Sequence, residues 1–451
     1  MYFFYTAALA LWLVLSAPIW LFWMLRQGKY RAGLGERLGR VPDRLRDRPP
    51  GQVIWVHAVS VGEVVAVSGL VGELRSRYPK VHVVVSTTTA TGQRLAGQRF
   101  GQENVFYFPL DFGFSIRPYL RSLQPSLVVV AETELWPNFL HLAKLSGAKV
   151  SIVNARISDR SFPGYGRVKR WLKRMLHDVD LFLAQTEEDR NRLLAIGAAP
   201  ERVRVAGNLK FDIDQPEVSA FVGSLRDALP SRSSAPVLVC GSTVEGEERV
   251  LLRAFEIVLG KYPDAVMVLA PRHPERFDTV AKLVESLGLR LWRQTEWRAE
   301  PLAGGVFLLD SIGELATVYS LATLAFVGGS LAQRGGHNIL EAVQWGVPVV
   351  VGPHTENFRD MVELFRASDA LRVAGMAELP LEFLDLLGDT DERASLGRRA
   401  LEVLRSQSGA TQRTLDALGQ LLPPPARSGG ARSVSQEVIS EVVAHKSADR
   451  P

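Results

Sequence analysis

The chain opens with an apolar run at residues 2–24, YFFYTAALALWLVLSAPIWLFWM, which contains no charged side chain. A helix of about 23 residues is long enough to cross the roughly 30 Å hydrocarbon core of a bilayer. Aromatic residues stand near both ends of the run, where interfacial anchors are expected: Tyr2, Tyr5, Trp20 and Trp23. The pattern therefore predicts a transmembrane anchor over residues 1–25.

Other interpretations of this run were weighed against the anchor. A cleaved signal peptide normally has a basic segment before a shorter apolar core, and the chain has neither. A buried helix, or one lying in the plane of a membrane surface, remains an alternative. Because the basic residues Arg26, Lys29 and Arg31 follow the run, the positive-inside rule predicts that everything after residue 25 lies in the cytoplasm.

From residue 51 onward, short β-branched runs alternate with amphipathic stretches, which is typical of βαβ units on a parallel sheet. The runs form two series separated by a Pro-, Ser- and Asp-rich stretch over residues 212–235. We expect the first series of strands at Val53–Val59, Val81–Thr87, Val105–Pro109, Leu127–Ala131, Val150–Asn154, Leu181–Gln185 and Val203–Ala206. We expect the second series at Val237–Gly241, Ala265–Ala270, Val306–Leu309, Leu324–Val327 and Val349–Gly352. Helices are predicted between the strands, for example at Glu63–Tyr78 and Glu187–Ile196.

This alternation predicts an α/β protein with two Rossmann-like domains, which suits a length of 451 residues. The N-terminal domain is expected over residues 26–208 and the C-terminal domain over residues 209–422. The segment from 423 to 451 begins PPPARSGGARS, and it is predicted to be a flexible tail.

The composition and charge of the chain narrow the classes of function that fit it. Hydrophobic residues make up 47% of the chain and charged residues 22%, which excludes wholesale disorder. Cys240 has no partner for an internal disulfide, which fits a reducing compartment. The net charge is +5, and residues 26–50 alone contain eight basic and three acidic residues. This basic segment beside the apolar run favours anionic lipid head groups over nucleic acid, for which the chain has no reading motif.

Ligands of open α/β sheets bind at the carboxyl ends of the strands, so the loops that follow the strands are the expected place of the catalytic and binding residues. SVGE places Glu63 at the start of a helix after the first strand, and AETELWPN places Glu132 and Glu134 after the fourth. A carboxylate there can act as a general base, whereas the alternatives are helix-dipole decoration and salt bridges. Lys210 in GNLKFD stands at the domain junction, where its charge suits a leaving phosphate.

Two further stretches of the first half have ordinary structural explanations beside the functional ones. STTTATG, residues 86–92, is predicted to cap a helix at Thr91 or to contact a sugar or phosphate. Residues 154–177 contain seven basic residues and one Asp, which favours either a solvated helix face or contact with the phosphates of an anionic acceptor.

In the second half, APRHPERF places Pro271 and Arg272 directly after a strand, and arginine suits bidentate phosphate contact. FVGGSLAQRGGHNILE presents glycine-rich backbone before a predicted helix, Ile339–Trp345, and predicts an anion site there. Glu341 in that helix is expected to accept hydrogen bonds from ribose. The histidines stand at separate strand ends without ligand spacing, so no metal site is predicted.

The order of these motifs resembles the 3-deoxy-D-manno-octulosonic acid (Kdo) transferases. The resemblance runs from about residue 30 to 410 through SVGE, TTTxTG, PLD, ETELWPN, NARIS, GxLKFD, GSTxEGEE, PRHPERF, GEL and GGSLxxRGGHNxLE. It implies a GT-B fold in which two Rossmann-like domains face a cleft. It also implies a CMP-Kdo donor, a lipid A precursor (lipid IVA) as acceptor, inversion at the anomeric carbon, no further cofactor and no obligatory metal. It further implies that the enzyme is located at the inner membrane and that it acts in lipopolysaccharide core biosynthesis.

The resemblance also implies roles for individual residues. Glu63 would be the general base, and Glu132 and Lys210 would stabilise the transition state. The residues that would hold CMP are Pro271, Arg272, Ile312, Gly313, Glu314, Asn338, Ile339, Leu340 and Glu341. The rival hypotheses are another GT-B enzyme, such as a nucleotide-sugar epimerase or an N-acetylglucosaminyl transferase, and a non-catalytic membrane-tethered binding module.

Overall fold

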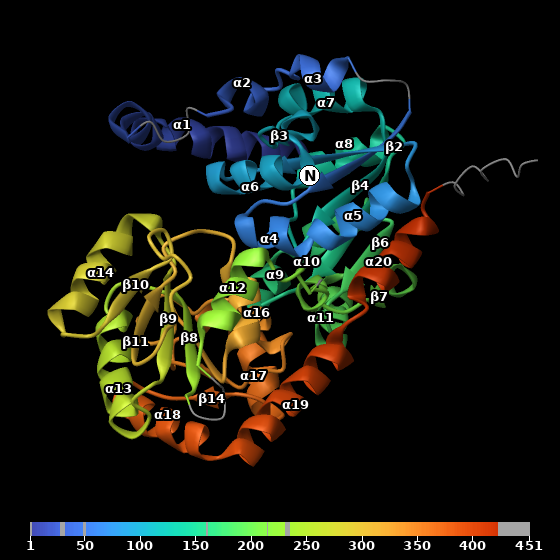
Figure 1. Cartoon of the computed structure of the whole chain (residues 1–451). Helices are drawn as coiled ribbons and strands as arrows, with labels where there is room; N and C mark the ends of the chain where they lie inside the picture. Colours follow the sequence, from blue (N-terminus) through green and yellow to red (C-terminus); the bar gives the residue numbers. More distant parts are fainter. Residues whose placement is uncertain are drawn as a thin grey trace, which may run out of the picture. The chain divides into compact units, whose positions relative to one another are not determined.

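A computed structural model describes residues 2–27, 32–47, 51–158, 161–213, 215–230 and 235–422. The chain divides into two compact units, one formed by Met1–Lys210 with Gly409–Pro451 and the other by Phe211–Ser408 (Figure 1). The predicted tail lies outside the described residues, as do Lys29, Arg31 and the side chains of Trp20 and Trp23.

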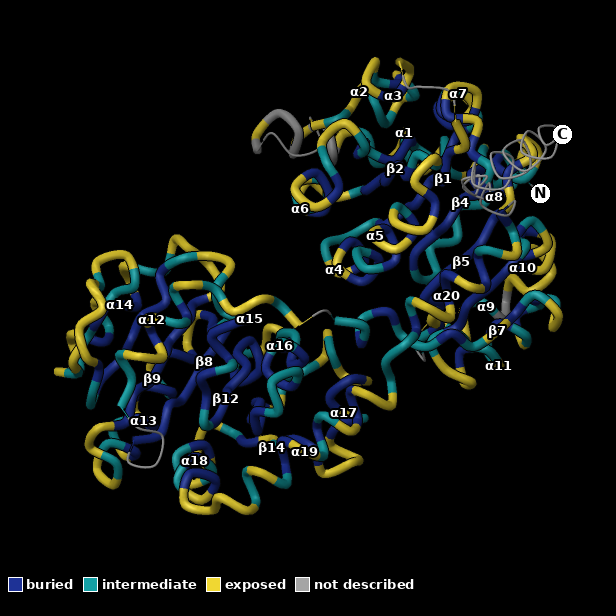
Figure 2. Tube along the Cα trace, turned by 45° about the vertical axis from the view of Figure 1, so that its right-hand side comes forward, coloured by how far each residue is buried: buried dark blue, intermediate teal, exposed yellow. Residues whose placement is uncertain are grey.

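The first unit is built on a seven-stranded parallel sheet with strand order β3-β2-β1-β4-β5-β6-β7. The strands are β1 (Gln52–His57), β2 (Val81–Thr87), β3 (Val105–Tyr107), β4 (Pro125–Ala131), β5 (Lys149–Ala155), β6 (Leu181–Ala184) and β7 (Val203–Val205). Their central residues are buried, because helices cover both faces of a sheet made by βαβ crossovers (Figure 2). All seven strands were predicted, and their observed ends differ by at most two residues.

The helices of this unit are α1 (Tyr2–Gln27), α2 (Leu34–Arg37), α3 (Asp43–Arg46), α4 (Val61–Ala66), α5 (Ser68–Arg77), α6 (Ala90–Phe100), α7 (Gly113–Leu123), α8 (Pro137–Leu145), α9 (Phe162–Arg167), α10 (Lys169–Leu176), α11 (Glu187–Ile196) and α20 (Ala410–Gly419). Two cores lie on opposite faces of the sheet. One joins α3, α7, α8, α10 and α11 around Trp55, which packs against the rings of Phe106 and Phe139. The other joins α4, α5, α6 and α20. The helix predicted at Glu63–Tyr78 is two helices, α4 and α5, with Val67 between them.

The N-terminal run forms a helix, α1, as its pattern predicts. Its first turns dock on the first unit: the Tyr2 ring stacks on His141 of α8 with centroids 3.9 Å apart, and Thr6 exchanges a hydrogen bond with Asn138. Farther along, apolar side chains stay 60–70% exposed, at Leu11, Trp12, Val14 and Leu15.

Within the described part of the chain, no helix has both the length and the apolar character that crossing a bilayer requires.

The last helix, α20, belongs to the first unit, although the sequence placed it in the second domain. Leu415 and Leu418 enter the core formed with α5, and Asp416 accepts a 2.8 Å bond from Arg77 of α5. Figure 1 shows where α20 lies in the ribbon. Amphipathic periodicity predicts that a helix has a buried face, but it does not identify the domain that buries it.

The second unit contains another seven-stranded parallel sheet, in the order β10-β11-β9-β8-β12-β13-β14. Its strands are β8 (Val237–Thr243), β9 (Val266–Pro271), β10 (Leu291–Arg293), β11 (Gly305–Leu308), β12 (Leu324–Val327), β13 (Val349–Val351) and β14 (Arg372–Val373). The sequence missed the two edge strands, β10 and β14, because two or three residues are too few for a periodic signal. The other five strands were predicted.

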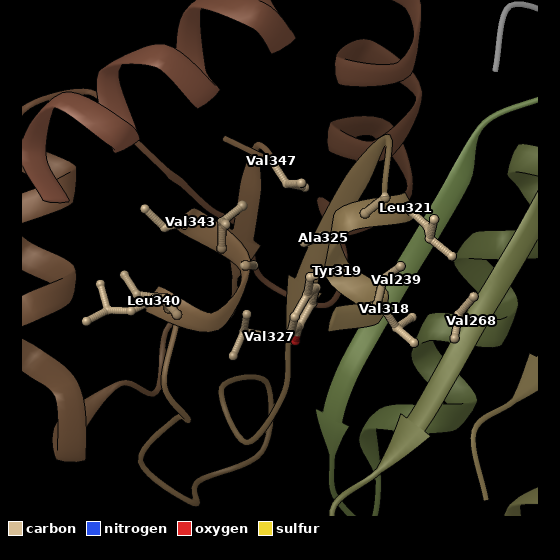
Figure 3. Packing of buried hydrophobic residues seen from close by; sticks show 14 of the residues in the cluster. Val239, Val268, Val318, Tyr319, Leu321, Ala325, Val327, Leu340, Val343 and Val347 are labelled. Carbon is tan, nitrogen blue, oxygen red and sulfur yellow. The ribbon is translucent and has the colours of Figure 1, made fainter. Parts of the chain in front are cut away.

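The helices of the second unit are α12 (Ala220–Ala228), α13 (Glu247–Lys261), α14 (Phe277–Ser286), α15 (Leu315–Val318), α16 (Leu340–Val343), α17 (Arg359–Ala367), α18 (Leu379–Gly388) and α19 (Thr390–Gln407). Again one core lies on each face of the sheet. Figure 3 shows part of one of these cores, with Leu340 and Val343 of α16 among the apolar side chains of the strands.

Candidate active site

Glu63 lies in the first turn of α4, immediately beyond the carboxyl end of β1. Ser60 caps this helix: its hydroxyl accepts from the Glu63 N–H and donates a 2.8 Å bond to Glu63 Oε1. The Val59 N–H donates a 2.7 Å bond to Glu63 Oε2. This arrangement is a variant of the capping box: the serine caps the helix start, and the glutamate three residues later accepts from the N–H of the residue before the cap and from the serine hydroxyl. The carboxylate is therefore held in one position by its own loop.

The environment of the Glu63 carboxyl suits a general base. The residue is only 6% exposed. Burial raises the pKa of the Glu63 carboxyl to about 7, although the bonds from Val59 and Ser60 oppose this, and the charges of Glu132 and Glu134 raise it further. A carboxylate has about four lone-pair positions, so the hydrogen bonds from Val59 and Ser60 leave room to accept a proton. A pKa near neutrality is the value at which a general base works best.

The threonine-rich turn after β2 braces this loop. Thr88 N–H and Thr89 N–H donate to the Val59 carbonyl at 3.1 and 3.2 Å. Thr89 also caps α6 by accepting from the Gly92 N–H at 3.1 Å, so the cap is Thr89 and not Thr91 as predicted. The Val59 peptide is thus held through its carbonyl while its N–H binds Glu63. The TTTATG motif therefore positions the neighbouring loop, whose Val59 N–H binds Glu63.

Glu132 forms an ion pair with Lys210. Glu132 follows β4, and its Oε1 lies 3.0 Å from Lys210 Nζ, with both side chains about one-third exposed. The backbone of Glu132 is left-handed, with φ of +55°, which is uncommon for a residue with a side chain. The chain therefore departs from extended geometry directly after β4, at Glu132. Burial and the Glu132 charge raise the pKa of Glu134. The structure therefore places the Lys210 cation beside Glu132, whose charge in turn raises the pKa of Glu63 and Glu134.

Two residues that the sequence did not single out hold the lysine loop. Asn154, at the end of β5, is 1% exposed with φ of +54°, and its Oδ1 accepts from the Leu209 N–H at 3.0 Å. Arg413 of α20 donates a 2.8 Å bond to the Ala206 carbonyl. An asparagine directly after a buried run is a usable signal, since asparagine tolerates the left-handed conformation. Arg413, roughly 200 residues away in the sequence, has no such signal.

The residues predicted to hold CMP are spread over three loops of the second unit, after β9, β11 and β12. Pro271 ends β9 and is buried, whereas Arg272 is exposed and its N–H bonds to the Thr243 carbonyl at 2.9 Å. Ile312 is 70% exposed, and Gly313 has φ of +111°.

The remaining predicted CMP residues differ in what they can offer a ligand. Glu314 accepts a 2.7 Å bond from Ser219, and Asn338 Oδ1 accepts from the Leu340 N–H. Ile339 and Leu340 are buried in the apolar core, so these two can reach a ligand only through their backbone. Figure 3 shows Leu340 in this core. Glu341 is partly exposed in α16.

A buried carboxylate occupies the glycine-rich loop after β12. Glu247 is fully buried at the start of α13, and its oxygens accept from the N–H groups of Gly329 and Leu331, both at 2.8 Å, and from Val244 at 3.0 Å. The Gly329 and Leu331 amides are therefore not free to bind an anion. The predicted helix Ile339–Trp345 is also shorter, since α16 covers only Leu340–Val343.

Side chains supply the positive charge around the glycine-rich loop after β12. Burial lowers the pKa of His337 to about 4, and the charges of Arg272 and His273 lower it further. Among the described residues, no group of three or more His, Cys, Asp or Glu side chains has the arrangement of a metal site.

Comparison with known proteins identifies the family. The family model described as 3-Deoxy-D-manno-octulosonic-acid transferase matches residues 32–213. The 3-deoxy-D-manno-octulosonic acid transferase of Haemophilus influenzae is 37% identical over 401 residues, which cover 87% of this chain and 92% of the relative. That of Bordetella pertussis is 36% identical over 421 residues, covering 90% and 96%.

Among solved structures, a putative UDP-N-acetylglucosamine 2-epimerase from Listeria monocytogenes is similar with a TM-score of 0.56, over 83% of this chain and 99% of the other, at 15% identity. The Neisseria meningitidis UDP-GlcNAc 2-epimerase gives 0.54, over 82% and 100%, also at 15% identity. At this identity the likeness concerns the fold alone, which is GT-B. The level of identity to the curated relatives over most of both chains leads to the conclusion that this chain belongs to the 3-deoxy-D-manno-octulosonic acid transferases, a family of glycosyltransferases.

Proposed function

We propose that this enzyme transfers Kdo from CMP-Kdo to the lipid A precursor lipid IVA, with inversion at the anomeric carbon and with Glu63 as the general base. The observation that carries the proposal is the Glu63 carboxyl, which is held in a capping box with a pKa of about 7 beside the Glu132–Lys210 pair. Its position at the carboxyl edge of a parallel sheet is where such folds bind their ligands.

The reaction has one proton transfer and one displacement. Glu63 takes the proton of an acceptor hydroxyl, and the hydroxyl oxygen forms a bond to the anomeric carbon of Kdo. The bond between that carbon and the phosphate oxygen breaks, and CMP leaves with the electron pair. Attack from the face opposite the leaving group inverts the configuration.

Lys210 and Glu132 help to stabilise the negative charge that develops on the leaving phosphate in this step. The ammonium of Lys210 is held 3.0 Å from Glu132, so its position is set before the substrates arrive. A positioned cation of this kind stabilises a developing negative charge without reorganisation. Glu132 keeps the lysine in place and offsets its charge in the resting enzyme.

The donor site is assigned to the second unit. Arg272 is exposed at the end of β9 and offers a guanidinium to the phosphate or to the Kdo carboxylate. Gly313 and Glu314 lie in a turn, and Asn338 to Glu341 offer backbone groups and two polar side chains. The cleft between two facing domains stays a prediction.

The location proposed for the enzyme is the inner membrane, with residues 1–25 attaching it to the membrane and the catalytic units in the cytoplasm. The exposed apolar side chains of α1 and the basic residues of 26–50 support association with an anionic lipid surface.

Incubation of the full-length protein in detergent with lipid IVA and CMP-Kdo tests the function. The expected result is a product whose mass exceeds that of lipid IVA by one or more Kdo units. Absence of any product with the wild-type protein, under conditions in which CMP-Kdo survives, would rule out the proposed reaction.

A further inference from the structure

A groove of about 540 Å³ lies in the first unit between the ETELWPN loop, α1 and α9–α10. Its walls are mostly aromatic and aliphatic, formed by Tyr5, Leu135, Trp136, Tyr165, Trp171 and Met175. Trp171 is 50% exposed, and the adjacent Val168 is 47% exposed. Half-exposed apolar side chains around a concave surface are typical of a ligand site, and the volume lies within the usual range of about 300–1,000 Å³.

The helix α10 separates this groove from a cationic one. Its sequence, KRWLKRML, turns Trp171, Leu172 and Met175 toward the apolar groove. The opposite side lines a second pocket, of about 970 Å³, with Lys169, Arg170, Lys173, Arg174 and, beyond the helix, His177. One short helix therefore offers an apolar surface on one side and four basic side chains on the other, which suits a molecule that is both acylated and anionic.

The polar end of the apolar groove lies at the same edge of the sheet as the proposed base. Glu134, which lines the groove, lies in the loop after β4, and Glu63 lies in the helix that follows β1. These two strands are parallel neighbours, so both loops leave the carboxyl edge of the sheet side by side. The charge of Glu134 also contributes to the raised pKa of Glu63.

We infer that this groove binds one acyl chain of the acceptor while the basic side of α10 contacts the acceptor's phosphate groups. The inference rests on the proposed function and deepens it: the enzyme recognises the lipid part of its acceptor as well as the sugar. An acyl chain in the groove removes Trp171 and Val168 from water, and it orients the sugar hydroxyl toward Glu63.

A pair of matched variants tests this. Trp171→Ser removes an aromatic wall of the groove, and Phe114→Ser removes a ring that is 62% exposed on α7, away from the groove. KM is measured for the tetraacylated acceptor and for the same acceptor without acyl chains. Trp171→Ser is expected to raise KM for the acylated acceptor about tenfold and to leave the deacylated acceptor unchanged, since only the former loses apolar contact. Phe114→Ser is expected to change neither.

Equal effects of Trp171→Ser on both acceptors, or no effect on either, would overturn the inference. Activity toward the deacylated acceptor also reports that the variant is folded.

A second experiment separates this inference from the proposed function. A tetraacylated acceptor carrying a diazirine on one acyl chain is photolysed with the full-length protein and with Glu63→Gln, both in detergent. The label is expected on peptides that contain Trp136 or residues 165–175 in both proteins, although only the wild type transfers sugar. Transfer by the wild type with no label in these peptides contradicts the groove. Absence of transfer by the wild type contradicts the function, whatever the label shows.

Discussion

Val59 and Glu63 are joined by a 2.7 Å hydrogen bond from the Val59 N–H to Oε2 of the carboxylate. The bond links the end of a sheet strand to the first turn of a helix, and the Val59 carbonyl is fixed in turn by two N–H groups of the neighbouring threonine turn. The proposed base is consequently attached to rigid elements on both sides. Little conformational freedom has to be lost when the acceptor binds, which favours rapid proton transfer.

Replacing Glu63 by Gln should abolish most transfer while leaving the fold intact. Glutamine still completes a capping box but is not a base, so kcat should fall by about 10²- to 10⁴-fold. Product formation from CMP-Kdo and lipid IVA is measured by mass. The matched control is Glu73→Gln, on the exposed side of α5, which should retain wild-type activity. A Glu63→Gln enzyme with near-normal kcat would remove Glu63 from the mechanism.

The pH dependence of activity should follow the same carboxyl. Because the pKa of Glu63 is raised from 4.5 to about 7, the base is protonated below neutrality. We expect kcat/KM to fall about tenfold for each unit of pH below this value. Initial rates between pH 5 and 8.5 provide the measurement. A flat profile down to pH 5 would mean that another group accepts the proton.

Folding stability should change with pH in the opposite direction. A carboxyl whose pKa is higher in the folded than in the unfolded protein makes the folded state bind more protons. Its contribution to stability is lost as pH rises from about 4.5 through 7, and a shift of this size corresponds to up to about 3 kcal/mol. Urea unfolding of the wild type and Glu63→Gln at pH 5 and pH 8 measures this. The difference between the two proteins should favour the variant more at pH 8, and a difference independent of pH would contradict the raised pKa.

Removal of the Lys210 charge should affect both rate and pH profile. In Lys210→Met, the Glu132 carboxylate loses its partner 3.0 Å away, and kcat should fall by about 10²-fold because the developing phosphate charge is no longer offset. The uncompensated Glu132 charge should also move the acidic limb of the profile to higher pH. Lys144→Met, on α8, breaks an ion pair with Asp180; this variant is the control and should change neither. A loss of rate without any movement of the profile would argue that Lys210 and Glu63 do not interact.

Replacement of Glu247 should weaken CMP binding through the loop that it holds. In Glu247→Gln, an amide nitrogen replaces one oxygen and cannot accept from the Gly329 or Leu331 N–H, so a buried donor loses its partner. We expect a loss of stability of about 3 kcal/mol and weaker CMP binding, measured by denaturation and by calorimetry. Glu245→Gln, whose side chain is 83% exposed, should behave as the wild type. Unchanged CMP affinity in a destabilised Glu247→Gln protein would limit Glu247 to a folding role.

Much of the fold could be predicted because its parallel strands are apolar runs. Val81–Thr87 and Leu324–Val327 were predicted to the residue, since strands buried on both faces need an unbroken series of β-branched side chains. The break between α4 and α5 at Val67 was missed, because the apolar pattern continues across it. The short strands β10 and β14 depend on pairing at a sheet edge, which the local sequence does not specify.

The sequence by itself determined the α/β class, the two series of strands and the loops in which Glu63, Glu132 and Lys210 lie, because these follow from local periodicity and from the position of polar residues after apolar runs. Only the tertiary structure decided which groups meet: that Lys210 pairs with Glu132, that Asn154 and Arg413 hold the lysine loop, that Glu247 occupies the glycine-rich amides, and that α20 packs on the first unit. These contacts join residues far apart in the chain. A hydrogen bond or an ion pair depends on distance in space, which no local pattern of side chains records.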